Sequence, residues 1–166
     1  MPAMEIARKI EKAWSSIPPP PEEEMGYFID GWGKREKALF LDVKPVSVDR
    51  EDADFLVADV LAEMSPVATA AYLGPYLITF FEDLAFQEDV GFFSEPSVRG
   101  AVLAVLTLPR AWSDVLRPNL PRNCKEALGD AVEYILKSEE LLKLNKSDIN
   151  SLEKILRSIR RDVDLK

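Results

Sequence analysis

The chain has 166 residues, 47% of them hydrophobic and 30% charged, so it is long enough for one globular domain with a buried core and too apolar to be disordered. It has no histidine and one cysteine, Cys124, which excludes an internal disulfide, Cys/His zinc sites and catalysis that needs histidine. Its net charge of −8 argues against nucleic acid as the main partner, because neutralising phosphates requires a surplus of basic side chains.

The first predicted element is an amphipathic helix over residues 3–16, in which apolar side chains recur at spacings of three and four. The four prolines 18–21 end this helix and are expected to form a short polyproline strut. Residues 17–46 are predicted to be an irregular connector. Within it, Gly31-Trp32-Gly33 indicates a turn, and residues 38–43 fit either a short strand or the end of a short helix.

A helix is predicted from Ser47 to Met64, with Ser47 or Asp49 as its N-cap and acidic residues in its first turn, where the helix dipole favours them. The next helix is predicted to begin at Ser65 as N-cap, with Pro66 in the first turn, and to end near residue 86. Both boundaries rest on local capping chemistry.

The helix after Ser65 contains a long apolar stretch, with no charge over the eighteen residues 64–81. This length reaches only the lower limit for crossing a bilayer, and no basic cluster flanks either end. We therefore expect a helix that is buried in a protein core and kinked at Pro75. The proline removes the donor that the carbonyl of Ala71 would otherwise bind, so a partner group or a buried water is expected there.

Three more helices are predicted, over residues 97–107, 121–142 and 147–166, and the second of these is expected to be the longest in the chain. A loop covers residues 88–96, and the segment 110–121 holds at most one helical turn. The sequence thus predicts an all-α, single-domain bundle (1–166) of about six helices around a buried, proline-kinked central helix, with 147–166 as a C-terminal helix that is possibly an addition.

No arrangement of residues identifies a reaction. The acidic string 49–54 lacks the glycine that a calcium-binding loop needs at its sixth position, and Val60 stands where the twelfth position needs a carboxylate. The pairs Glu82-Asp83 and Glu88-Asp89 each project about 100° apart on a helix, so neither pair converges on one substrate. No catalytic, metal-binding or cofactor-binding residue is assigned, and we expect a protein that is not an enzyme.

The acidic residues are concentrated in the middle of the chain. Residues 47–98 carry 11 acidic side chains and 1 basic, whereas residues 1–46 carry 8 and 7 and residues 99–166 carry 10 and 13. Such a concentration favours a protein partner with a basic surface. Our first hypothesis is a bacterial immunity protein, similar to an antitoxin, that neutralises a toxin through the region 47–98. The expected partner-binding residues are Glu51, Asp52, Asp54, Asp59, Glu88 and Asp89.

The second hypothesis is a small-molecule-binding or enzymatic helical domain with a pocket beside Tyr72, Pro75 and Tyr76. Aromatic rings four residues apart form a column along one face of a helix, where their hydroxyls can orient a ligand. The same spacing also fits a column that faces the core and bonds its hydroxyls to neighbouring backbone. The sequence does not decide between these two arrangements.

Both termini carry charged helices. The N-terminal segment interleaves charged and apolar residues, which does not fit a signal peptide, so a cytoplasmic location without membrane contact is expected. The basic residues Lys154, Arg157, Arg160 and Arg161 complement the negative end of the last helix, and binding of phosphate is the alternative role. Cys124 is expected to be a buried thiol on a helix.

Three stretches resemble a family of small bacterial proteins of uncharacterised function: IARKIEKAWSSIPPPP, MSPVATAAYLGPYL and LPRNCKEALGDAVEYIL. That family has an amphipathic first helix, a Ser/Thr-Pro followed by a Tyr-Leu-Pro-x-Tyr-Leu core, and a late helix that ends in an aromatic residue and leucine. The likeness covers residues 4–138. This chain differs in its Tyr-Leu-Gly-Pro-Tyr-Leu core and in its last helix. The resemblance implies a helical fold and a bacterial source, and it implies no catalytic residue.

Overall fold

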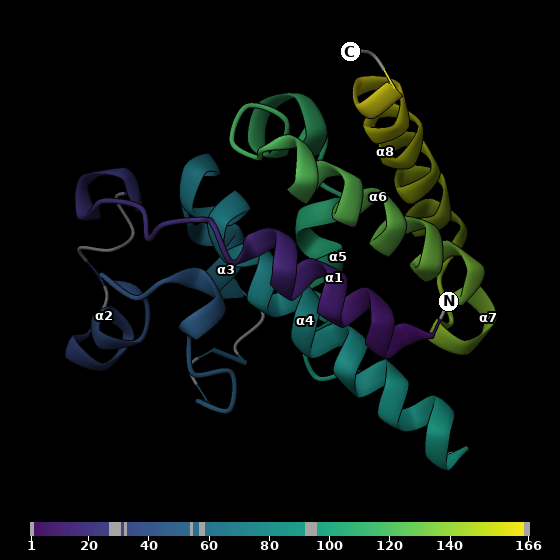
Figure 1. The fold of residues 1–166 in the computed structure, drawn as a ribbon, viewed down its shortest axis with the longest axis horizontal. Helices are drawn as coiled ribbons and strands as arrows, with labels where there is room; N and C mark the ends of the chain where they lie inside the picture. The colour runs from purple at the N-terminus through teal and green to yellow at the C-terminus, as the bar shows by residue number, and fades with distance from the viewer. Residues whose placement is uncertain are drawn as a thin grey trace.

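The computed structural model describes residues 2–26, 31, 33–53, 55–56, 59–91 and 96–164, with backbone only at positions 35 and 59. In these ranges every regular element is helical and no strand occurs, which confirms the predicted all-α class (Figure 1). Eight α-helices are described, of which five have eight or more residues. Two of the three short ones, Lys34–Phe40 and Glu139–Leu142, account for the difference from the predicted six.

The central element is α4 (Pro66–Val90), a helix of 25 residues that runs without a break through Pro75. It begins as predicted, because the Ser65 side chain accepts a hydrogen bond from the amide of Ala68 at 3.2 Å and Pro66 occupies the first turn. It ends four residues later than predicted, at Val90, and the next residue, Gly91, has a φ of +66°, the left-handed conformation that glycine adopts readily.

The apolar stretch of α4 is enclosed by the rest of the domain. Every residue from Ala68 to Phe81 is buried, and α1 (Ala3–Trp14) packs along this half of the helix (Figure 1). A helix that is apolar on all sides is expected to be surrounded by others, so this burial explains the composition. Within the described ranges, no helix combines the length and hydropathy needed to cross a membrane.

Two long helices follow on the far side of α1. α6 (Arg122–Lys137) packs against α1, and α8 (Lys146–Asp164) packs against α6 with Leu152, Ile155 and Ile159 buried. Cys124 of α6 is buried, its thiol lies 3.3 Å from the carbonyl oxygen of Ala13, and burial raises its pKa to about 12. The thiol is therefore a core group, as expected.

Shorter elements complete the domain. α5 (Arg99–Leu106) is followed by a π-helix (Ala111–Leu116), and both contact α4. α2 (Lys34–Phe40) and the 3₁₀ turns Glu22–Glu24 and Pro45–Ser47 lie within or next to the segment predicted to be irregular. Because residues 38–40 are helical and 41–42 form a turn, the strand considered for 38–43 is wrong.

The helix predicted from Ser47 to Met64 is also wrong over its first half. The described residues from Asp49 to Leu56 form turns, and only α3 (Asp59–Glu63) is helical. The carboxylate of Asp49 accepts a hydrogen bond from the amide of Glu51 at 3.1 Å. Such a local bond offers the backbone an alternative to the helix, which is why aspartate favours turns as well as caps.

The segment predicted as the longest helix, 121–142, is divided. α6 ends at Lys137, a break occurs at Ser138, and the four-residue α7 (Glu139–Leu142) follows. The longest helix is α4 instead. The remaining boundaries, those of α1, α5 and α8, agree with the predicted segments to within two residues at each end described.

Candidate protein-binding surface

The last turns of α4 extend beyond the helices that cover its first half (Figure 1). Phe86 is 67% exposed and Val90 is 52% exposed, the two highest values among the large hydrophobic side chains that the structure describes. Both are on a helix that is fully buried a few residues earlier. An apolar pair left exposed on such a helix is the kind of feature that marks an interaction site when it is joined to others.

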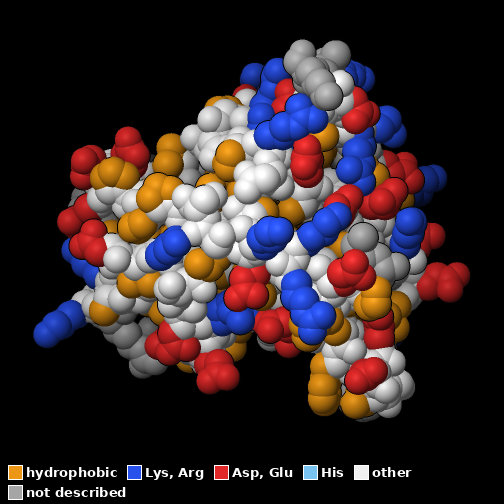
Figure 2. All heavy atoms as spheres, viewed as in Figure 1, with side chains coloured by type: hydrophobic (Ala, Val, Ile, Leu, Met, Phe, Trp, Pro, Cys, Tyr) orange, Lys and Arg blue, Asp and Glu red, His pale blue; other side chains and the backbone are white. Residues whose placement is uncertain are grey.

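Phe86 and Val90 belong to one stripe of α4. With Glu82 and Asp89 they occupy positions i, i+4, i+7 and i+8, which fall on the same face of an α-helix. We call these four residues the α4 stripe. It alternates acidic and apolar side chains, and Figure 2 shows such a mixture on the projecting end of α4 at the lower right.

The turns after Ser47 are held beside this stripe by Arg50. Its guanidinium forms an ion pair with Glu82 and lies 3.3 Å from the hydroxyl of Thr79, both on α4. The contact places the next residues in the chain, Glu51 and Asp52, next to the start of the stripe. Local sequence does not reveal this arrangement, because 32 positions separate Arg50 from Glu82.

The electrostatics of this surface are one-sided. Arg50 is the one basic residue in the segment 47–98, and Glu82 neutralises it. Glu88 and Asp89 lie in the last turn of α4, which contains no basic residue. Negative side chains there face the negative end of the helix dipole, an unfavourable placement of about 0.3–1 kcal/mol each when solvent-exposed. The surface is therefore acidic at a cost to the isolated domain.

The structure brings together three of the six residues predicted to bind a partner. Glu51 and Asp52 follow Arg50, which pairs with Glu82, and Asp89 follows Glu82 by about two helical turns on the same face. Asp54 lies outside the described residues, and although Asp59 begins α3, its side chain lies outside them too. Glu51 and Asp89 are exposed, so both are accessible to a partner.

Glu88, the sixth predicted residue, faces another direction. The hydroxyl of Tyr134 on α6 lies 2.9 Å and 3.0 Å from its two carboxylate oxygens. Burial and the neighbouring Glu88 raise the pKa of Tyr134 to about 12, so the phenol remains the donor at neutral pH. Glu88 thus ties the end of α4 to α6 and lies apart from the stripe.

Tyr72 and Tyr76 form a packed column in the core. Both have 0% exposure; Tyr72 donates to the carbonyls of Phe40 (2.6 Å) and Val43 (3.1 Å), and Tyr76 donates to that of Phe55 (2.7 Å). The Tyr76 ring stacks on the Phe55 ring at 4.0 Å. Burial raises the pKa of both phenols. Their hydroxyls are thus occupied by backbone, which is the core-facing arrangement and leaves neither free to orient a ligand.

The backbone near Pro75 is satisfied from α1. The indole of Trp14 donates a hydrogen bond to the carbonyl of Ala70 at 3.2 Å, one residue before the predicted Ala71. Gly74 allows this approach, because a Cβ at that position would lie 2.8 Å from the indole nitrogen and closer still to the ring carbons. The bound carbonyl is thus the neighbour of the predicted one, and a partner for the carbonyl of Ala71 stays a prediction.

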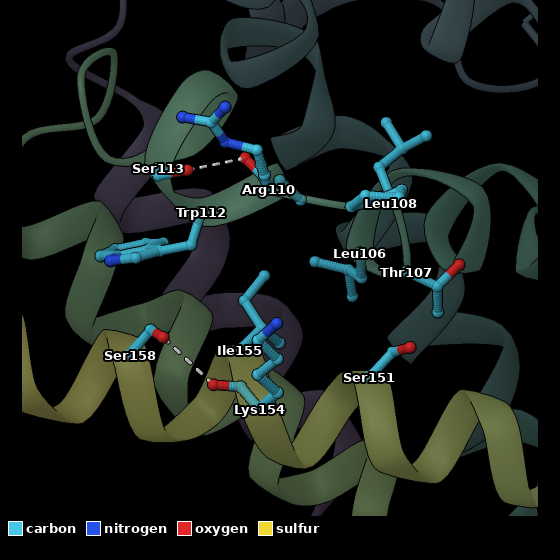
Figure 3. Close-up of a pocket in the computed structure, with 12 residues that line it drawn as sticks. Leu106, Thr107, Leu108, Arg110, Trp112, Ser113, Ser151, Lys154, Ile155 and Ser158 are labelled. Carbon is cyan, nitrogen blue, oxygen red and sulfur yellow. Dashed lines mark hydrogen bonds between the residues drawn. The ribbon is translucent and has the colours of Figure 1, made fainter.

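Two surface grooves, of about 410 Å³ and 380 Å³, lie away from the tyrosine column. The larger is between the π-helix segment and α8 (Figure 3), and the smaller is lined by Ile6 and residues of α6. The described residues contain no cluster of three carboxylate or cysteine groups able to hold a metal ion.

Sequence reasoning missed Phe86 and Val90 because it ended the helix near residue 86. The spacing of Glu82, Phe86, Asp89 and Val90 was the available signal, since it continues a helical period through the acidic segment.

No protein-family model, curated protein or solved structure matches this chain. The resemblance to small bacterial helical proteins accordingly stays a prediction.

Proposed function

We propose that this chain is a non-enzymatic interaction protein that binds a basic surface on a protein partner through the α4 stripe and the adjacent Glu51 and Asp52. The observation that carries the proposal is that exposed apolar and acidic side chains share one face of α4. The basic residue beside them, Arg50, is already paired with Glu82. Phe86, Asp89 and Val90 are exposed, so most of their surface takes no part in the packing of the domain.

The two kinds of side chain suit a protein partner better than a small ligand. An exposed aromatic residue such as Phe86 can fill a pocket on the partner and supply most of the binding energy, as anchors at interface centres do. The carboxylates around it supply steering and orientation, which increase the association rate more than the affinity. Binding to a cationic surface would also relieve the unfavourable position of Asp89 at the end of α4.

A toxin domain that acts on nucleic acid is the partner that this chemistry fits best. Such an enzyme must carry basic side chains around its active site in order to bind phosphates. An acidic protein that covers this site blocks access to the substrate without chemistry of its own, which is the role of an immunity protein. This function implies a cytoplasmic location, where the protein would meet its toxin.

The test is to purify the protein encoded by the adjacent gene and to measure its binding to this chain by calorimetry at low and high salt. We expect a complex that weakens with salt and a partner activity that falls on binding. Phe86→Ser should weaken binding by about 2 kcal/mol, roughly thirtyfold, because it removes an interface anchor. The double variant Glu51→Gln with Asp89→Asn should mainly slow association and reduce the salt dependence.

The matched control is Glu11→Gln with Glu153→Gln, which removes the same charge from exposed positions on α1 and α8. We expect its binding to equal that of the parent within about twofold, since remote surface charges change little. Failure to form a complex, or equal weakening by both double variants, would refute the assignment of the α4 stripe.

A further inference from the structure

A second feature of the molecule, the larger groove, lies in the C-terminal third of the chain. It has a volume of about 410 Å³, which is within the usual range for sites that bind small molecules. One wall is the segment from the end of α5 into the π-helix, and the other is the outer face of α8. Figure 3 shows Lys154 and Ile155 rising from α8 toward Leu106 and the segment above it.

The groove has an apolar base and a polar rim. Leu106 and Ile155 are buried and Trp112 is half-buried, so the base offers carbon surface of the kind that holds the body of a ligand. Three rim hydroxyls donate to nearby carbonyls: Thr107 to Leu103 at 2.6 Å, Ser113 to Arg110 at 3.3 Å, and Ser158 to Lys154 at 3.2 Å. Each of these bonds spans three or four residues of the same segment.

Ser151 differs from these three hydroxyls. It is half-buried in the groove wall and makes no hydrogen bond to any residue in the described ranges. Lys154, one helical turn later on the same face of α8, likewise has no ion-pair partner there. A hydroxyl and an ammonium group without partners thus lie side by side on one wall.

The charge of the groove is opposite to that of the whole chain. Its lining includes two cations, Arg110 and Lys154, and no acidic residue, in a protein of net charge −8. Arg110 is at the rim, where it pairs with the exposed Asp114 at 3.3 Å. Lys154 is exposed and has no ion pair among the described residues, whereas Asp162, farther along α8, pairs with Lys125 at 2.9 Å and with Arg117 at 3.0 Å. The groove lining therefore carries one cation whose charge no carboxylate of the described residues neutralises.

The backbone above α8 has an unusual conformation that shapes the groove. Arg110 has φ +60°, which residues other than glycine seldom adopt, and it leads directly into the π-helix. Single π-turns are rare and are found frequently at functional sites. Here the turn places Trp112 and Ser113 in the groove wall that faces α8 (Figure 3).

We propose that this groove binds a small organic anion with an apolar body. The anionic group lies at Lys154 and Ser151, and the apolar body lies on Leu106, Trp112 and Ile155. The site is separate from the α4 stripe. Its ligand is an anion, whereas the partner proposed for the α4 stripe has a basic surface.

The experiment uses 4-phenylbutyrate as the probe and its uncharged counterpart, 4-phenylbutan-1-ol, on the intact chain. Backbone amide shifts are followed by NMR during titration, so that the place of binding and the dissociation constant come from the same data. We expect saturable shifts confined to residues 106–113 and 151–158, and binding of the alcohol that is about fivefold weaker, because it lacks the charge that Lys154 attracts.

Lys154→Gln keeps most of the side-chain stem and removes the charge; it should weaken binding of the carboxylate about fivefold and leave that of the alcohol unchanged. Lys146→Gln, at an exposed position of α8 outside the groove, is the matched control and should leave both constants unchanged within about twofold. Equal affinity for the two probes, shifts that lie elsewhere, no saturation, or equal effects of the two lysine variants would each overturn the proposal.

Discussion

Two helix pairs in this domain are built around a glycine, and they use it differently. In the α1–α4 pair, Gly74 lies against the indole of Trp14, which is fully buried and hydrogen-bonded to the backbone of α4. In the α6–α8 pair, Gly129 lies against Arg160 and Ile159, with the nearest guanidinium atom 3.1 Å from where its Cβ would be. At Gly74 the neighbour is a fixed ring in the core, whereas at Gly129 the neighbours are the end of a flexible arginine and one methyl group of the buried Ile159.

The residues around the two glycines also differ, being aromatic and buried near Gly74 and charged near Gly129. Near Gly74 the helices meet through the buried ring of Trp14, whose indole donates to the carbonyl of Ala70, and the tyrosines of α4 bind carbonyls of other segments. Near Gly129 they meet through an ion-pair network in which Asp130 binds Lys9 and Arg160, and Arg160 also binds Glu133 at 3.5 Å. The first interface is therefore expected to be rigid and intolerant of added volume, and the second to be adaptable and sensitive to pH.

The largest expected effect is that of Gly74→Ala. The new methyl group would overlap the Trp14 ring, which is held on all sides, and we expect a loss of about 2–3 kcal/mol in the free energy of unfolding. Gly129→Ala is the matched change in the other pair. There the arginine can move aside, the Ile159 methyl group has to shift by only a few tenths of an ångström, and alanine favours the helix, so the expected change is within about 1 kcal/mol of zero.

Urea denaturation of both variants, followed by circular dichroism, measures this difference. A domain of ordinary stability, about 5–15 kcal/mol, remains folded after the larger loss, so the two values are comparable. Equal losses for Gly74→Ala and Gly129→Ala would show that the two interfaces do not differ in rigidity.

A smaller effect is expected from removing the buried hydroxyls beside the α1–α4 interface. Tyr72→Phe and Tyr76→Phe leave the carbonyls of Phe40, Val43 and Phe55 without these donors in a dry environment, at about 1–3 kcal/mol for each variant. Tyr134→Phe is the control, because its bond to Glu88 is exposed to solvent and is expected to contribute less than about 1 kcal/mol. Thermal and urea unfolding of the three variants give the ranking, and a Tyr134 variant as unstable as the others would contradict it.

The tyrosines also illustrate how much of the fold could be predicted from the sequence. The apolar stretch 64–81 and the Ser65-Pro66 cap are sufficient to predict a buried helix with the correct start, because burial and capping are recorded in neighbouring residues. The spacing of Tyr72 and Tyr76 indicates a shared face. What the hydroxyls bind could not be predicted, because their acceptors are 21 to 32 positions away in the chain.

The segment after Ser47 shows why the rest could not be predicted. Its acidic residues and apolar spacing fit a helix, yet Arg50 reaches Glu82 and the Phe55 ring stacks on that of Tyr76. Contacts between distant segments thus decide the conformation over local preference. The candidate partner surface follows the same rule. Its acidic character is visible in the sequence, but the separation of Glu88 from Asp89 depends on the position of α6.

The smallest expected effect concerns Asp130, at the centre of the α6–α8 network. Burial alone would raise the pKa of this carboxyl, but hydrogen bonds and attraction from Lys9 and Arg160 outweigh it and lower the pKa below the ordinary 3.8. The unfolded chain therefore takes up this proton at a higher pH than the folded chain does. The stabilisation is complete above the unfolded value and is lost as the pH falls through the lower folded value.

Asp130→Asn should consequently destabilise the domain at pH 7 by about 1 kcal/mol or less, since the network is partly exposed to solvent. The difference in the free energy of unfolding between the variant and the parent should shrink between pH 5 and pH 3, because the carboxyl of Asp130 titrates over roughly this range. Urea unfolding at pH 7, 5 and 3 measures it, with Glu153→Gln as an exposed control that changes stability by less than about 0.5 kcal/mol. A difference that is constant with pH, or that grows on acidification, would show that Asp130 stabilises the second interface by shape and not by charge, and the contrast with the first interface would then lose its electrostatic basis.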